Sequence, residues 1–128
     1  MTLCRSTCVA CLLSFIAGAG IVWTQQPARG TSRREAQFEN DQVVVWKSIV
    51  MPKQPLTLHR HDHGRVLVAL TNGRLRVVDK DGKVLDTYNL RAGRAMWLGA
   101  DPPGQLHADV NDGSRPVEVI VVQLKNDQ

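Results

Sequence analysis

From Val43 onward, the chain consists of short β-rich runs separated by turn residues. The runs are Val43–Met51, Leu56–His61, Val66–Leu70, Arg74–Val78, Val84–Leu90, Ala95–Leu98, Leu106–Val110 and Val117–Leu124. Several are separated by Asn-Gly or Asp-Gly turns, which close hairpins between antiparallel strands. No stretch longer than a turn or two repeats its apolar residues with the 3.6-residue period of a helix. This pattern predicts an all-β domain, built as one small antiparallel barrel or sandwich.

The N-terminal segment has a different character. Arg5 is the only charged residue before Arg29, and an apolar stretch runs between them from Cys8 to Trp23. Together with the small residues Ala17-Gly18-Ala19, this predicts a secretory signal peptide. An uncleaved membrane anchor is the alternative, although the stretch is slightly shorter than the ~20 apolar residues of a spanning helix. We therefore expect an exported protein, either periplasmic or secreted, or one anchored in a membrane and facing outward.

The chain divides on this basis into three segments. Residues 1–24 form the signal peptide or anchor, residues 25–42 form a polar linker, and residues 43–126 form the β domain. All three cysteines lie in the first segment, so that the β domain contains neither a disulfide nor a thiolate metal site. A domain this small buries a limited core, and a homodimer is one expected means of stabilising it.

The charged residues exclude one class of partner. The net charge is +4, and lysines and arginines alternate with aspartates along the β domain. Nucleic-acid-binding domains instead collect their basic residues in a patch or stripe. We expect no nucleic-acid partner.

The histidines are the strongest functional signal. Of the four histidines in the chain, three lie within five residues, at His59, His61 and His63. Residues two apart in a strand project from the same face, which brings His59 and His61 together. Neutral imidazole is a common ligand of divalent transition metals, and His107 is the natural third ligand from another strand. His59, His61 and His107 are therefore the predicted metal ligands.

Two motifs with this histidine spacing occur in a known superfamily. Its first motif reads G-(X)5-H-X-H-(X)3–4-E-(X)6-G, and its second reads G-(X)5–7-P-X-G-(X)2-H-(X)3-N. The chain has His59-X-His61, followed by Val66 and Gly73, and later Pro102-X-Gly104-(X)2-His107-(X)3-Asn111. On these residues the chain resembles the cupin superfamily over Val43 to Leu124. The resemblance implies a barrel of the cupin or jelly-roll type, with a divalent metal in its pocket and a small molecule as its ligand.

The chain departs from the family pattern at two positions of the first motif. Lys53 stands where the motif has its first glycine, and Val66 stands at the position of the metal-binding glutamate. In one interpretation the three histidines still hold a divalent ion, with His63, Asp62 or Asp109 as candidates to complete the set of ligands. In the other, the metal has been lost and the barrel is a non-catalytic small-molecule-binding or structural module.

Other polar residues carry less information. Arg60 and Arg65 are expected to point away from the histidines into solvent, although Arg65 near the pocket mouth would attract an anion. Ser48 and Ser114 have no neighbouring base that would activate a nucleophile. The sequence therefore leaves open whether the protein is an enzyme.

Overall fold

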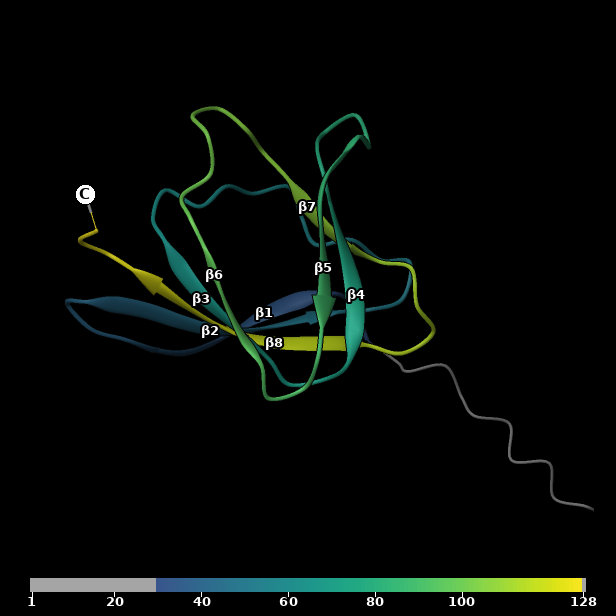
Figure 1. Ribbon diagram of the computed structural model, residues 1–128, viewed down its shortest axis with the longest axis horizontal. Helices are drawn as coiled ribbons and strands as arrows, with labels where there is room; N and C mark the ends of the chain where they lie inside the picture. Colours follow the sequence, from purple (N-terminus) through teal and green to yellow (C-terminus); the bar gives the residue numbers. More distant parts are fainter. Residues whose placement is uncertain (1–29, 128) are drawn as a thin grey trace, which may run out of the picture.

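The computed structural model describes residues 30–127, so that the predicted signal peptide or anchor lies outside the described residues. The described part contains eight strands and no helix that could cross a membrane (Figure 1). The strands are β1 (Arg33–Glu39), β2 (Val43–Val50), β3 (Arg65–Ala69), β4 (Gly73–Val78), β5 (Val84–Leu90), β6 (Ala95–Leu98), β7 (Ala108–Asn111) and β8 (Val117–Leu124).

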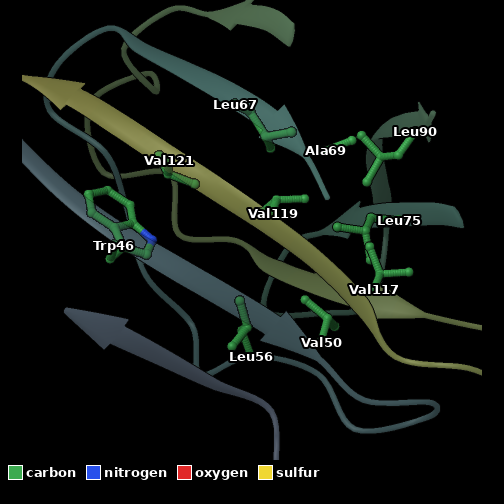
Figure 2. Close-up of a cluster of buried hydrophobic side chains, with 10 residues drawn as sticks. All are labelled: Trp46, Val50, Leu56, Leu67, Ala69, Leu75, Leu90, Val117, Val119 and Val121. Carbon is green, nitrogen blue, oxygen red and sulfur yellow. The ribbon is translucent and has the colours of Figure 1, made fainter. Parts of the chain in front are cut away.

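The strands form two antiparallel sheets. The larger sheet has the order β1-β2-β8-β3-β6, and the smaller one has the order β5-β4-β7. Between them lies a core of alternating inward-facing residues, which Figure 2 shows from both sheets. Its buried members are Trp46, Val50, Leu56, Leu67, Ala69, Leu75, Leu90, Val117, Val119 and Val121. The predicted all-β antiparallel barrel is confirmed.

Strand β1 lies within residues 25–42, where the sequence predicted a linker. It pairs with β2 from Arg33 opposite Ile49 to Glu39 opposite Val44, at the edge of the larger sheet (Figure 1). Its side chains are mostly exposed, and a bulge between Ala36 and Phe38 interrupts the register. Because backbone hydrogen bonds rather than apolar burial hold this strand, its sequence lacks the alternation that indicates a half-buried strand. Residues 33–39 therefore belong to the sheet.

The segment between β2 and β3 runs alongside β7 without forming a long strand. Leu56 N–H donates to the Asp109 carbonyl at 3.1 Å, and His59 and His107 exchange two backbone hydrogen bonds of 2.9 and 2.8 Å. The predicted run Leu56–His61 is thus reduced to one isolated β-bridge at His59. This bridge sets two of the candidate ligands opposite each other.

Lys53 begins this segment in a left-handed conformation, with φ of 57°. It is the one non-glycine residue with a positive φ among the described residues. The motif glycine that Lys53 replaces would adopt this conformation without strain, since a Cβ disfavours it by about 1–2 kcal/mol.

Candidate metal centre

The three predicted histidine ligands converge in the structure. The ring centroids of His59 and His107 are 4.3 Å apart, and the His61 ring lies 4.9 Å from His59 and 5.6 Å from His107. One side-chain nitrogen of each residue lies within 4.8 Å of the others. The group is therefore close enough to hold a metal ion.

Each histidine has an acceptor beside its Nδ1 atom. The His59 Nδ1 lies 2.7 Å from the Thr57 carbonyl oxygen, and the His61 Nδ1 lies 2.7 Å from Oε1 of Gln123. The His107 Nδ1 lies 3.3 Å from Oδ2 of Asp101. An acceptor at this position fixes the proton on Nδ1 and leaves the lone pair on Nε2, as is usual for metal-binding histidines.

The Nε2 atom of His59 fits a metal ligand especially well. It is buried and has no hydrogen-bond partner among the described residues. The nearest charged group is the carboxylate of Asp109, whose Oδ2 lies 3.7 Å away. A buried polar atom without a partner costs free energy, and a bound cation would remove that cost. The donor set is therefore consistent with a divalent transition metal.

The electrostatic environment keeps two of the rings neutral. Burial lowers the pKa of His59 to about 4 and that of His61 to about 3. For His61, the positive charge of Arg65 lowers the pKa further. Both rings are uncharged at neutral pH, and the neutral imidazole is the form that binds metals.

Two aspartates complete the polar surroundings. Asp109 lines the internal cavity, and burial raises the pKa of its carboxyl group. Asp101 accepts a 2.6 Å hydrogen bond from the backbone N–H of His61 and lies beside His107. Asp109 was a candidate from the sequence. Asp101 was missed, because nothing in the loop before His107 indicated that its side chain turns back toward His61.

His63, the other candidate from the histidine cluster, lies outside the three-histidine group. Its Nδ1 is 2.6 Å from Oδ1 of Asp127, and the other carboxylate oxygen of Asp127 accepts the Gly64 N–H at 2.6 Å. In the described structure His63 thus connects the start of β3 to the C-terminal residues.

Arg34 was also missed by the sequence analysis. Its guanidinium lies 5.1 Å from the Trp46 ring centroid, and Nη2 is 3.4 Å from Nε2 of His61. The Trp46 and His61 rings are parallel, with centroids 5.7 Å apart. Arg34 extends to this position from β1, the strand that was predicted as a linker, while the residue as a whole stays exposed.

A small internal cavity lies among these groups. Its volume is about 30 Å³, which is about the space of one water molecule or one ion. The polar residues that line it are Arg34, Ser48, His61, Arg65, Tyr88, His107 and Asp109.

Solved structures share this arrangement of strands. A cupin domain from Bordetella pertussis Tohama I superposes with a TM-score of 0.64 at 23% identity, covering 76% of this chain and 96% of that chain. An RmlC-like cupin with a double-stranded β-helix fold from Methanocaldococcus jannaschii gives a TM-score of 0.56 at 14% identity, covering 83% of this chain and 91% of that chain.

This chain has the cupin fold.

A protein with a double-stranded β-helix domain from Klebsiella pneumoniae is a further similar structure, with a TM-score of 0.56 at 24% identity, covering 80% of this chain and 84% of that chain. No family model and no curated protein matches the sequence. The fold is thus shown by structure, as the spacing of the two cupin motifs predicted.

The motif spacing leaves two positions for its glutamate, and the structure shows that they face different sides of β3. Val66 is half-buried and pairs with Trp97 and Val122 in the larger sheet, while its neighbours Arg65 and Leu67 face the cavity. The motif allows three or four residues after the second histidine, and the shorter spacing ends at Arg65. Of the two positions, Arg65 is therefore the one that faces the cavity, whereas Val66, the position predicted from the longer spacing, does not.

Arg65 is 4% exposed, in contrast to the expectation that it points into solvent. It donates a 2.8 Å hydrogen bond to the Gly99 carbonyl and lies 3.5 Å from Asp101. These two acceptors compensate the burial of its charge. Arg60, which was also expected to point into solvent, is half-buried and pairs with Asp62 at 2.6 Å.

Proposed function

We propose that this chain is an exported cupin-fold protein that binds one divalent transition-metal ion through His59, His61 and His107, and a small molecule beside that ion. The convergence of three imidazoles with their Nδ1 atoms held by acceptors carries the metal proposal. Export rests on the signal-like pattern of residues 1–24.

The donor set restricts the kind of metal. Neutral imidazoles favour zinc, iron, nickel, copper or manganese over calcium and magnesium. Three protein ligands leave coordination positions open, and a metal in such a site acts as a Lewis acid toward a bound small molecule. The chain's own residues fix the rings: Thr57, Gln123 and Asp101 hold the three Nδ1 atoms in place.

A metal-free binding barrel is the second candidate function. It is favoured by Arg65, whose positive charge occupies the position of the cupin glutamate, and by the Arg34 guanidinium beside Nε2 of His61. Both charges repel a cation. In this candidate function the histidines act as hydrogen-bonding groups for the ligand.

Calorimetric titration with zinc and with nickel decides between them. After dialysis against chelator and then metal-free buffer, the wild-type protein should take up one ion per chain. His59→Ala and His107→Ala should each weaken binding by roughly 100-fold or more, because each removes a ligand. His63→Ala is the matched control and should change the affinity less than about threefold, since His63 contacts Asp127 instead. A wild-type protein that takes up neither metal would support the metal-free barrel.

A further inference from the structure

Arg34 is exposed on β1, and its guanidinium has no close ion-pair partner among the described residues. Its neighbours Arg33 and Arg65 each have a carboxylate partner, Glu35 at 2.7 Å and Asp101 at 3.5 Å. Within residues 30–127, no carboxylate oxygen lies within 4 Å of Arg34. The guanidinium instead lies over the Trp46 ring and beside Nε2 of His61. Partial burial of the guanidinium lowers the pKa of Arg34, and the more distant charge of Asp109 opposes this shift. The residue as a whole stays exposed, so that a ligand can reach it from solvent.

Arg34 also lies at the boundary between two spaces. It lines the internal cavity of about 30 Å³ and an outer groove of about 390 Å³ between the start of β1 and residues 56–59. The groove is lined by Ser32, Arg33, Arg34, Leu56, Thr57, Leu58 and His59. The cavity is too small for an organic molecule, whereas the groove has a volume typical of small-molecule sites.

The residues that line the groove indicate the chemical character of a ligand. Leu58 is 41% exposed, and Leu56 lies behind it in the core. This provides an apolar surface next to a guanidinium that has no ion-pair partner within 4 Å among the described residues. His59, one of the three candidate metal ligands, lines the same groove.

The charged residues around the metal centre indicate the sign of the ligand's charge. Two arginines and two aspartates, Arg34, Arg65, Asp101 and Asp109, surround the histidines, so that their formal charges sum to zero. A divalent cation adds positive charge without a counterion. An anion that pairs with Arg34 would compensate this charge.

We propose that the groove binds a small organic carboxylate, with its carboxylate paired to the Arg34 guanidinium and its apolar body along Leu58. The two N–H groups at one edge of a guanidinium match the two oxygens of a carboxylate, which makes arginine the preferred partner for this group. The proposal deepens the proposed function and rests on it, because it names the class of the small molecule that binds beside the metal.

Three probes of the same shape and different charge test it: benzoate, benzamide and benzamidine. Binding is followed by tryptophan fluorescence and by calorimetry in the metal-loaded wild-type protein. Benzoate should bind at least tenfold more tightly than neutral benzamide, and cationic benzamidine should bind most weakly. Arg34→Gln should lower the benzoate affinity about tenfold or more, to the level of benzamide, because it removes a charged hydrogen bond.

Two further variants control the result. Arg74→Gln removes the same charge from an exposed position of β4 and should leave benzoate binding within about twofold. Arg34→Lys keeps the charge and should retain an intermediate affinity, which separates loss of pairing from loss of folding. Equal binding of benzoate and benzamide, absence of benzoate binding, or equal effects of Arg34→Gln and Arg74→Gln would overturn the proposal.

The same titrations in metal-free protein separate this proposal from the previous one. Metal uptake without charge-selective benzoate binding would overturn the carboxylate site and leave the metal centre intact. Benzoate binding that depends on Arg34 without any metal uptake would support the carboxylate site and overturn the metal centre.

Discussion

Three residues separate His61 from Arg65, which is the shorter of the two spacings that the cupin motif allows for its metal-binding glutamate. Arg65 lies at an inward position of β3. Replacing it by glutamate would remove a buried positive charge and add a carboxylate at the cavity. Val66, one residue later, faces away from the cavity, so that a carboxylate there could not reach the ion. The two positions therefore provide a matched pair of variants.

Arg65→Glu should raise zinc affinity about tenfold or more, since the new carboxylate both ligates and attracts the cation. It should also lower the free energy of unfolding of the metal-free protein by about 3 kcal/mol, because Asp101 loses its partner and gains a like charge. Val66→Glu should leave the zinc affinity unchanged. Calorimetry and urea unfolding measure both effects, and equal zinc affinities in the two variants would contradict this account of β3.

The neutral histidines predict how stability depends on pH. In the folded protein the pKa of His59 is about 4 and that of His61 is about 3, against 6.5 in the unfolded chain. Between these folded and unfolded pKa values, the unfolded chain binds more protons than the folded protein. The contribution of the neutral rings to the free energy of unfolding is therefore fully present above pH 6.5, and it falls as the pH drops from 6.5 toward 4. We expect a loss of about 1 kcal/mol per pH unit in chelator, after allowing for solvent screening.

His61→Gln tests the origin of this dependence. Burial raises the pKa of Asp109, and this shift changes the free energy of unfolding with pH in the direction opposite to that of the histidines. The Asp109 carboxyl group is present in both the wild type and the variant. Removing one titrating ring should reduce the slope of unfolding free energy against pH by about half between pH 6.5 and 4.5. A slope identical to that of the wild type would show that this ring does not contribute.

At the level of single residues, the sequence predicted the site unevenly. His59, His61 and His107 were predictable because alternation and motif spacing both place them on one face. Arg65 was assigned to the wrong face because the motif allows two spacings, and a shift of one residue in a strand exchanges its faces. Arg34 could not be predicted, because its contact with His61 depends on β1 pairing with β2.

At the scale of elements, the segment from Lys53 to His59 carries the site while forming little regular structure. The left-handed conformation of Lys53 begins it. Lys53→Gly should raise the free energy of unfolding by about 0.5–1 kcal/mol, because relief of strain exceeds the added entropy of the unfolded chain. Lys83→Gly, at an exposed position without a positive φ, should produce no gain. Urea unfolding compares the two variants, and equal changes would contradict strain at Lys53.

Asn111 connects the end of β7 to its surroundings. It is 1% exposed, and its Nδ2 donates to the carbonyls of Val50 at 2.9 Å and Arg115 at 2.8 Å. Its Oδ1 accepts the Gly113 N–H at 2.9 Å. Asn111 matches the asparagine of the second cupin motif, but the sequence did not indicate what this residue does. The structure shows that it joins β2, β7 and the turn that leads to β8.

Asn111→Ala should lower the free energy of unfolding by about 3 kcal/mol, because it leaves buried backbone groups without partners. Asn89→Ala is the control, since Asn89 is exposed on β5, and it should cost less than about 0.5 kcal/mol. Chemical unfolding measures both. Similar losses in the two variants would contradict the connecting role of Asn111.

At the scale of the whole molecule, the sequence predicted the fold well and its N-terminal boundary poorly. Short alternating runs and turn residues indicated the all-β barrel, since period-two alternation and hairpin turns are local signals. The edge strand β1 is polar on both faces and gives no such signal. Homodimer formation and export remain predictions of the sequence.

The whole fold serves to bring His107, which lies 46 residues beyond His61, to the same point as His59 and His61. X-ray absorption at the zinc edge of the metal-loaded protein tests this convergence most directly. We predict a first shell with the scattering of three imidazoles at about 2.0–2.1 Å from zinc, falling to two in His107→Ala. A shell with one imidazole or none, or an identical shell in His107→Ala, would contradict a three-histidine metal centre.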